Sequence, residues 1–380
     1  MPEAYIVDAA RTPYGKRGGS FRDTHPQDLA TFPLKAIVER TGLRPEDIDD
    51  VLLGCVSPTG EQGLNIARMA TLNAGFGVGV PGVTLNRMCG SGQNAVNLAA
   101  TMVKSRDYGI VLAGGVENMT RVPIGSDAGA VSPNLEAKYE ILHQGESAER
   151  IADQWKLTRE DLDRFAVESQ RRQGLAMEEG RLKREIVPVE VTVDGQKAWI
   201  TQDEHPRPQT TIEKLGALKP VFRPENGRVT AGNSSGIVDG ATAVLVASED
   251  VVRDRGWKPR GRIVAQTVVG SDPALMLTGP IPATKKVLAK AGLTIDQIDL
   301  FECNEAFASV PLAWMRDTGA PYDRVNVNGG AIARGHPLGA TGAGLITTVL
   351  HELERTQKRY GLVTMCIGFG QGIATIVERV

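Results

Sequence analysis

The fold is decided at residues 81–100, which read PGVTLNRMCGSGQNAVNLAA. Residues 81–85 resemble the end of a strand and residues 93–100 a helix, so Cys89 stands in a strand-to-helix turn. The partial positive charge of a helix N-terminus favours a thiolate there, and Gly90 and Gly92 let another group approach the sulfur closely. This geometry suits a nucleophile that is acylated and then deacylated. The alternative is a small buried cysteine before a flexible turn.

The composition bounds the class of protein. A chain of 380 residues predicts about two or three domains. Its 23% of charged residues and net charge of −2 fit a globular protein and give no basic excess for nucleic acid. No apolar run is long enough to span a membrane, and residues 1–8 enter a strand pattern without a signal peptide. We therefore expect a cytoplasmic protein with no membrane insertion.

The cysteines and histidines predict neither disulfides nor a metal site. Cys55, Cys89, Cys303 and Cys366 form no Cys-x-x-Cys pair, so we expect reduced thiols. The five histidines show no zinc-ligand spacing.

Short apolar runs alternate with amphipathic stretches and predict strands with helices packed on them. The strands are expected around 6–7, 51–53 and 110–113, and the helices at 28–40, 63–73 and 92–104. The C-terminal third repeats the pattern: Gly42-Leu43 and Ile48-Asp49 recur 250 residues later as Gly292-Leu293 and Ile298-Asp299, and Tyr108-Gly109 recurs 252 residues later as Tyr360-Gly361. These matches indicate an internal duplication, the alternative being unrelated units that share a Gly-Leu cap.

Residues 119–230 fit neither half. Segment 119–145 is rich in Gly, Pro, Ser and Asn and is expected to be an ordered loop, 147–180 helical with a start at Thr158, and 186–193 a strand. We thus predict an N-terminal half of residues 1–118 with about 231–255, an inserted loop domain of residues 119–230, and a C-terminal half of residues 256–380.

Three further motifs lie at the C-terminal ends of predicted strands, where sites form in open α/β sheets. They are Asn304-Glu305-Ala306-Phe307, the glycine-rich segment 329–339 that contains His336, and Cys366-Ile367-Gly368-Phe369-Gly370-Gln371-Gly372. Taken singly, His336 could cap a turn, Cys366 could belong to the core and Asn304 could cap a helix. Together with Cys89 they would supply a nucleophile, a base, a second acid/base and a polarising donor.

The chain resembles the thiolase family over essentially its whole length. The resemblance rests on the order and spacing of six segments: 87–92, Gly115-Val116-Glu117-Asn118-Met119, 231–241, 304–307, Gly335-His336-Pro337 and Cys366-Ile367-Gly368. It implies an α/β thiolase-like fold, with two duplicated βαβαβ-type halves, helices packed on mixed sheets, and an inserted loop domain that binds coenzyme A.

The resemblance also implies residue roles. Cys89 would be the acylated nucleophile, and His336 would take its proton. Cys366 would exchange a proton with the α-carbon of the acetyl unit. Asn304 would hold a water that, with His336, stabilises an enolate oxygen. The N–H groups of Cys89 and Gly368 would form a second oxyanion hole, as expected for a reaction that develops charge on two oxygens.

Coenzyme A would be a substrate, and no cofactor is expected. Arg207 would face its adenine end, Ser235 its pantetheine, and His143 would line the tunnel, with Phe307 assigned to the same site. The alternative for Arg207 is a solvated surface arginine.

Three departures from the family pattern, and one likeness to a part of the family, bear on substrate specificity and on tetramer formation. Phe369 stands where many thiolases have Gly, and we expect its ring in the core behind the loop. Gln144 replaces a methionine of short-chain biosynthetic members, and segment 119–143 is shorter than in tetrameric ones. The tail from Arg324 resembles degradative bacterial 3-ketoacyl-CoA thiolases.

The sequence therefore predicts a 3-ketoacyl-CoA thiolase, as in fatty acid β-oxidation, that forms a homodimer or a dimer of dimers. Within the class, the alternative is an acetyl-CoA C-acetyltransferase that runs towards condensation. A decarboxylating ketoacyl synthase should carry a second His or Asn in place of Cys366. From a different class, the alternative is a catalytically silent subunit that binds acyl-CoA or scaffolds a partner.

Overall fold

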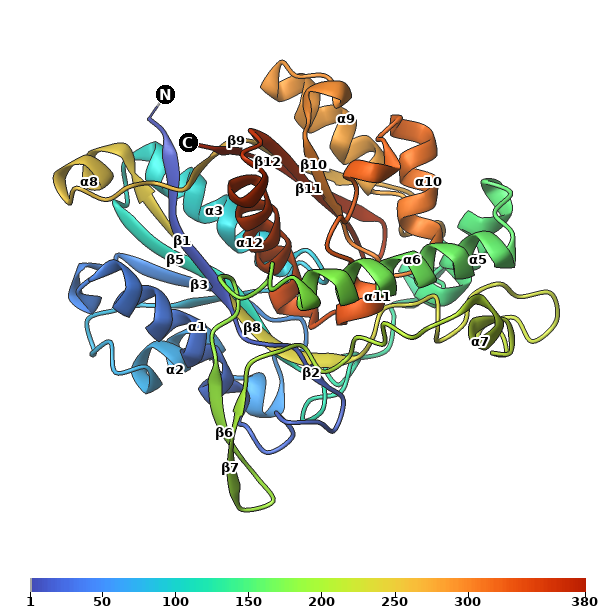
Figure 1. Cartoon of the computed structure of the whole chain (residues 1–380), viewed down its shortest axis with the longest axis horizontal. Helices are drawn as coiled ribbons and strands as arrows, with labels where there is room; N and C mark the ends of the chain where they lie inside the picture. The colour runs from blue at the N-terminus through green and yellow to red at the C-terminus, as the bar shows by residue number, and fades with distance from the viewer. Residues whose placement is uncertain (1) are drawn as a thin grey trace.

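A single mixed sheet runs through the whole molecule (Figure 1). The computed structural model describes residues 2–380. The strands follow the order β10-β11-β12-β9-β1-β8-β5-β3-β4, and β2 pairs with β8 beside this path. Their bounds are β1 Ala4–Arg11, β2 Gly15–Lys16, β3 Asp50–Gly54, β4 Val83–Leu85, β5 Ile110–Asn118, β8 Val238–Ser248, β9 Gly261–Gly270, β10 Leu300–Cys303, β11 Tyr360–Ile367 and β12 Gln371–Arg379.

The two halves of the sheet have the same strand topology. In the N-terminal half β3 is parallel to β5, β5 antiparallel to β8, and β8 antiparallel to β1. In the C-terminal half β10, β11, β12 and β9 pair in the same senses. The predicted duplication and α/β class are confirmed. The two halves also join edge to edge, because Tyr5 and Ile6 of β1 pair with Arg262 and Gly261 of β9.

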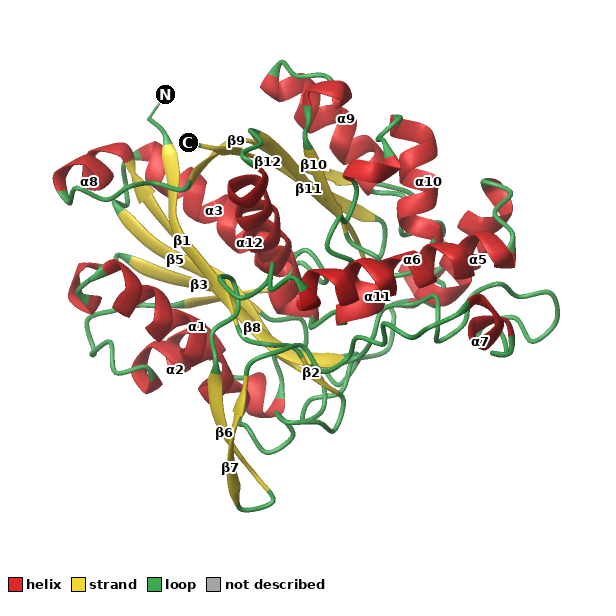
Figure 2. Cartoon of the chain, viewed as in Figure 1, coloured by secondary structure: helices red, strands yellow, loops and turns green. Residues whose placement is uncertain are grey.

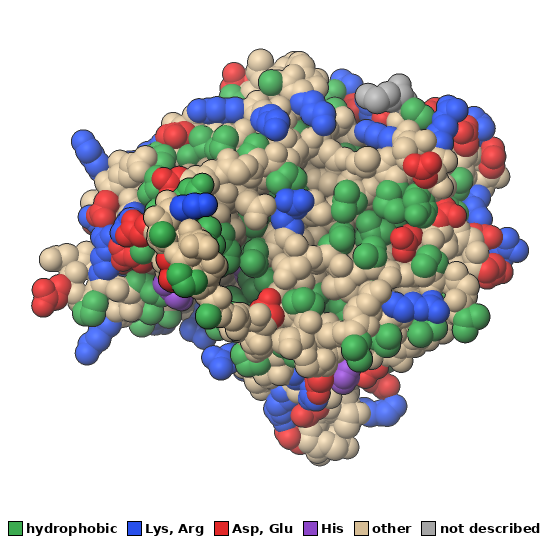
Figure 3. Space-filling view, turned by 180° about the vertical axis from the view of Figure 1, so that it is seen from behind, with side chains coloured by type: hydrophobic (Ala, Val, Ile, Leu, Met, Phe, Trp, Pro, Cys, Tyr) green, Lys and Arg blue, Asp and Glu red, His purple; other side chains and the backbone are tan. Residues whose placement is uncertain are grey.

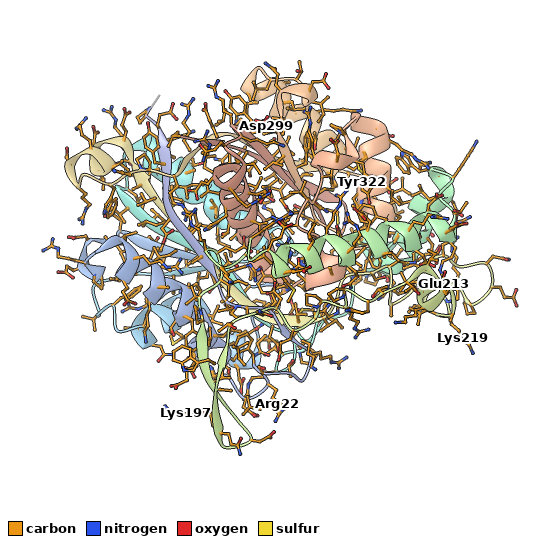
Figure 4. The ribbon with its side chains drawn as sticks, viewed as in Figure 1. Arg22, Lys197, Glu213, Lys219, Asp299 and Tyr322 are labelled. Carbon is orange, nitrogen blue, oxygen red and sulfur yellow. The ribbon has the colours of Figure 1, made fainter. Side chains whose placement is uncertain are left out.

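The repeated sequence matches correspond to repeated local structure. Helix α1 (Pro26–Thr41) ends at Gly42 with φ 63°, and helix α9 (Pro280–Ala291) ends at Gly292 with φ 67°, a left-handed backbone that glycine adopts without steric cost. Asp49 then accepts hydrogen bonds from the backbone N–H groups of Gly109 and Ile110, at the start of β5. Its counterpart Asp299, labelled in Figure 4, accepts from Arg359 and Tyr360 at the start of β11.

Two helices lie between the halves of the sheet and form the central layer (Figure 2). They are α3 (Ser91–Ser105) and α12 (Leu338–Thr356); α12 is buried over most of its length, whereas α3 exposes Leu98 and Thr101. Their first turns touch: a Cβ on Gly92 would lie 2.6 Å from the carbonyl oxygen of Gly339. The loops that precede α3 and α12, which carry Cys89 and His336, are therefore neighbours.

Outer helices cover the two remaining faces. Helices α1 and α2 (Ile66–Asn73) pack on the N-terminal half, and α9 and α10 (Ser309–Thr318) pack on the C-terminal half. The short helices α8 (Glu249–Asp254) and α11 (Ala331–Arg334) complete the two halves.

The long helices of the segment between β5 and β8 pack against the C-terminal half, and its hairpin packs against the N-terminal half. It contains α4 (Pro133–Glu136), α5 (Gln144–Gln154), α6 (Arg159–Glu178), the hairpin of β6 (Val189–Val193) and β7 (Gln196–Ile200), and α7 (Ile212–Gly216). As predicted, α6 starts at a capping box in which Thr158 and Asp161 exchange hydrogen bonds. Sequence reasoning missed β7. The limits assigned to the three domains stay a prediction.

Within residues 2–380, no helix is both long and apolar enough to cross a bilayer.

Candidate active site

An apolar cavity of about 320 Å³ lies beside the start of α3. Five residues singled out from the sequence line it: Cys89, His143, Ser235, Phe307 and His336. Most of the remaining wall is hydrophobic, including Met119, Ile124, Val221, Phe222 and Leu338. The Phe307 ring packs edge-on to Phe222, which in turn stacks on His143. A thiol and an imidazole thus open into one small apolar chamber.

Cys89 stands on a tight turn one residue before the N-cap of α3. Met88 has φ 45°, and the side chain of Ser91 fixes this turn by accepting from the backbone N–H of Arg87 and donating to the carbonyl of Met88. The backbone N–H groups of Cys89 and Gly368 act on the sulfur and lower its pKa, but burial is the larger cause and raises that pKa to about 11. Burial therefore outweighs the favourable backbone N–H groups at the helix start, and the thiol needs a proton acceptor, as expected for a cysteine whose proton His336 would take.

His336 can be that acceptor. The side-chain oxygen of Thr341 donates to the carbonyl of Pro337, so it accepts from His336 Nδ1 at 2.6 Å. The amide nitrogen of Asn304 lies 3.4 Å from Nε2 and can only donate to it. Both contacts assign the proton to Nδ1 and leave a lone pair on Nε2. Burial lowers the pKa of His336 to about 4, which keeps the ring neutral.

Asn304 follows β10 and is almost fully buried. Its backbone N–H donates to Thr364 on β11, which fixes the side chain beside His336. Among residues 2–380, no group hydrogen-bonds to its Oδ1. A buried carbonyl oxygen without a partner is costly, so this atom is suited to a polar group that arrives with the reaction.

Cys366 is the second thiol of the site. It lies near the end of β11, is 1% exposed, and is close enough to Cys89 for their charges to interact. Burial raises the pKa of the Cys366 thiol far above its ordinary range, so it is protonated at rest. Gly368 follows in the turn to β12 and brings its N–H to the Cys89 sulfur.

Phe369 lies outside the core. Its side chain is 49% exposed and its backbone has φ 59°. The expectation of a ring packed behind the loop is wrong, because the left-handed turn between β11 and β12 directs the side chain outward.

A wider cavity of about 610 Å³ adjoins the inner one through the shared segment 231–237, which includes Ser235. Arg207, Lys16, Arg17 and His205 line it, and no Asp or Glu of residues 2–380 is among its lining residues. Arg207 is exposed and is one of the residues that line this opening. A cationic mouth that leads to an apolar chamber with a thiol suits an anionic, elongated thioester.

Six of the nine residues expected at the site line two adjoining cavities, and the other three adjoin one of these six: Asn304 contacts His336, and Cys366 and Gly368 act on Cys89. Sequence reasoning missed Thr341, which orients the base, and Phe222, which forms one wall. Thr341 stands one helical turn after Pro337 on α12, a spacing that could have indicated the contact. Nothing local in the sequence indicates Phe222.

Comparisons with known proteins agree with this arrangement. Residues 4–250 match the family model "Thiolase, N-terminal domain" and residues 257–379 match "Thiolase, C-terminal domain". The chain is 46% identical to a beta-ketoadipyl-CoA thiolase of Acinetobacter baylyi, with all of both chains covered. It is 45% identical to a steroid 3-ketoacyl-CoA thiolase of Mycobacterium tuberculosis, with 100% of this chain and 95% of the relative covered. The crystal structure of human mitochondrial 3-ketoacyl-CoA thiolase superposes with a TM-score of 0.92 at 38% identity, covering 100% of this chain and 99% of that one.

The chain belongs to the thiolase family. It is thus an acyltransferase enzyme.

Proposed function

We propose that the enzyme cleaves a 3-ketoacyl-CoA with coenzyme A to give acetyl-CoA and a shortened acyl-CoA. The observation that carries the proposal is the Cys89 sulfur in the inner cavity, with two backbone N–H groups acting on it and His336 in the same wall. Such N–H groups stabilise the oxyanion of a tetrahedral intermediate in acyl transfer.

The proposed cleavage uses each residue in turn. His336 Nε2 takes the proton of Cys89, and the thiolate attacks the C3 carbonyl carbon of the substrate. The oxyanion accepts from the N–H groups of Cys89 and Gly368. The C2–C3 bond then breaks, leaving the shortened acyl group on Cys89 and the enolate of acetyl-CoA, which Cys366 protonates at C2.

The second half-reaction regenerates the enzyme. Cys366, now a thiolate, takes the proton of an incoming CoA thiol, and the CoA sulfur attacks the acyl carbon. Cys89 leaves and recovers its proton from His336. Whether the carbon–carbon bond is cleaved or formed, Asn304, with a water and His336, is proposed to hold the enolate oxygen of acetyl-CoA. The buried, unpartnered Oδ1 of Asn304 and its contact with Nε2 support this role.

The outer cavity is proposed to hold the CoA body. Arg207, together with Lys16 and Arg17, supplies positive charge for the phosphates, and Ser235 and His143 flank the path of the pantetheine arm. Phe307 closes the inner end beside Phe222.

We propose that the preferred substrate is a 3-ketoacyl-CoA whose acyl tail is uncharged. The names of the relatives point to different tails, one dicarboxylic and one steroid. Among residues 2–380, no lysine or arginine lines the inner cavity, and its polar wall groups are amide, hydroxyl, thiol and imidazole groups. A terminal carboxylate would lose its hydration there without an ionic partner.

A substrate panel tests both parts. Thiolysis rates are measured for acetoacetyl-CoA, 3-ketohexanoyl-CoA, 3-ketooctanoyl-CoA and 3-oxoadipyl-CoA, and condensation of acetyl-CoA is measured alongside. We expect kcat/KM to be higher for 3-ketohexanoyl-CoA than for 3-oxoadipyl-CoA. The reverse order contradicts the uncharged tail. No thiolysis of any substrate favours a silent acyl-CoA-binding subunit and contradicts the proposed function.

A homodimer is proposed as the working form. Strand β4 is the edge of the sheet and offers unpaired backbone groups. The exposed hydrophobic residues Leu64, Leu72, Val78, Val83 and Leu98 surround it in sequence, and hydrophobic side chains gather on the N-terminal-half side of the face in Figure 3. Light scattering should give twice the chain mass, and Val83→Lys should lower it. Location in the cytoplasm stays a prediction.

A further inference from the structure

Glu117 is a buried carboxylate that no proposed step uses. It stands near the end of β5 and is 1% exposed. Oε2 accepts hydrogen bonds from the backbone N–H groups of Val56 at 2.8 Å and Gly339 at 2.9 Å. Oε1 accepts from the N–H of Ser57 at 3.1 Å and from the amide of Gln62 at 2.7 Å. Burying a carboxylate is costly unless it is fully hydrogen-bonded, so this arrangement stabilises only one placement of the three segments it joins.

One of these segments supports the nucleophile turn. The carbonyl of Val56 accepts from the side chain of Asn86, whose Oδ1 accepts from the backbone N–H of Met88. The N–H of Cys55 also donates to the carbonyl of Leu85. Glu117 is thus connected to Met88, the residue before Cys89, through three consecutive hydrogen bonds that pass through Val56 and Asn86.

Another segment carries the base. Gly339 is the second residue of α12 and stands three residues after His336. Its N–H is 222 residues from Glu117 in the chain. Val56, Met119 and Leu338 form a small hydrophobic cluster with Met88 and Cys89 in the same place. One carboxylate therefore holds the turn of Cys89 and the helix start of His336 together.

We propose that Glu117 is a positioning residue that fixes Cys89 and His336 at the distance needed for proton transfer. The inference rests on the proposed function, because proton transfer from Cys89 to His336 is a step of the proposed reaction. Glu117 takes no part in a reacting step and forms no hydrogen bond with the side chains of Cys89, Cys366 or His336. It acts through the backbone of the two loops that carry Cys89 and His336.

Glu117→Gln tests the proposal, because the amide nitrogen of Gln cannot accept from the N–H groups that face one carboxylate oxygen. A displacement of about 1 Å can cost about 100-fold in rate. We expect acylation of Cys89 by 3-ketohexanoyl-CoA, followed by rapid quench and peptide mass spectrometry, to slow by about 100-fold. The KM for coenzyme A should stay within about threefold. Folded Glu117→Gln with native kcat overturns the proposal.

The pH dependence of Cys89 alkylation by iodoacetamide separates positioning from charge. In this reaction the sulfur displaces iodide and only the thiolate reacts quickly. Once His336 is too far away to take the Cys89 proton, alkylation depends on ionisation of the thiol by solvent alone, so the profile should move to higher pH. The negative charge of Glu117 itself raises the pKa of the Cys89 thiol, so loss of charge alone would move the profile to lower pH. A shift to lower pH, or none, overturns the proposal.

Matched variants guard against general destabilisation. Asp49→Asn removes a carboxylate that accepts from Gly109 and Ile110 at the opposite end of the same strand, and it should leave both readouts unchanged. If Glu117→Gln does not fold, Glu117→Asp keeps the charge and shortens the side chain. A folded Glu117→Asp should show slower acylation, and a native rate overturns the proposal. Alkylation needs no substrate, so an enzyme inactive on every ketoacyl-CoA refutes the proposed function while this test still reports on positioning.

Discussion

The loops that start α3 and α12 occupy equivalent places in the duplicated fold, and their side chains have opposite constraints. Cys89, before α3, has only backbone N–H groups acting on its sulfur, which opens to the cavity. His336, before α12, is held on both ring nitrogens, by Thr341 and by Asn304. The contact of the two helix starts at Gly92 and Gly339 brings them together. The duplication thus supplied two adjacent helix starts, for which we propose different roles, one as the nucleophile and the other as an oriented base.

The largest effect on kcat should come from replacing Cys89 or His336 by alanine. Cys89→Ala should lower kcat by at least about 10⁴-fold at every pH, because no acyl-enzyme can form. His336→Ala should be similarly slow at pH 7 but recover as the pH rises toward 11, where Cys89 ionises unaided. Activity and intact-protein mass across pH 7–10 measure both. Recovery of Cys89→Ala at high pH, or none for His336→Ala, would remove the distinction between the two helix starts.

The next largest effect, on the rate of carbon–carbon cleavage, concerns Cys366, which has no equivalent cysteine in the N-terminal half. Cys366→Ser should still acylate Cys89 from an acyl-CoA, yet lose about 10²- to 10⁴-fold in carbon–carbon cleavage. Exchange of deuterium into acetyl-CoA should fall in parallel. Native exchange would make Cys366 structural.

A smaller effect concerns stability. The pKa of His336 is lowered by burial from 6.5 to about 4. The unfolded chain therefore binds this proton first as the pH falls, and the stability that the neutral ring retains above pH 6.5 is lost progressively towards pH 4. Relative to His336→Asn, the wild-type free energy of unfolding should drop by about 2 to 3 kcal/mol between pH 7 and 4.5. Urea titrations at both values check this, and parallel curves for the two proteins would contradict it.

The smallest effect concerns Phe369. Replacement by Gly leaves no cavity, because the ring is half exposed, and it relieves a left-handed φ while freeing the unfolded chain. We expect stability to change by less than about 1 kcal/mol. If the free energy of unfolding in a urea titration fell by about 3 kcal/mol or more, the Phe369 ring would have to be buried, against the exposed position in the structure.

Much of the fold could be predicted because its signals are local. The glycines at 42 and 292 end helices in both halves, and Thr158 with Asp161 starts another. The joining of β1 to β9 could not be predicted, since two short pairings between distant strands leave no pattern in either segment. The hairpin partner β7 was missed because its strand is polar and exposed.

The same division holds at the site. The thiols, His336 and Asn304 were identified through motifs, and their placement agrees with the roles proposed for them. The favourable effect of backbone N–H groups on Cys89 could be expected from its helix start, but the larger opposing effect of burial on its pKa could not. The outward direction of Phe369 depends on a backbone angle that residue types do not reveal. The hydrogen bonds that Glu117 accepts reach segments up to 222 residues away in the chain, so no local spacing rule could have predicted them.

The central place of β1 has a consequence for synthesis on the ribosome. Both strands that pair with β1 lie far downstream: β1 ends at Arg11, and β8 begins at Val238, 227 residues later. At about 5 to 20 residues per second, the first partner emerges on the order of 10 to 50 s after β1. During this interval a nascent apolar strand has no edge to join. The earliest segment made is among the last to find its place, and this enzyme should depend on chaperones that shield emerging chains.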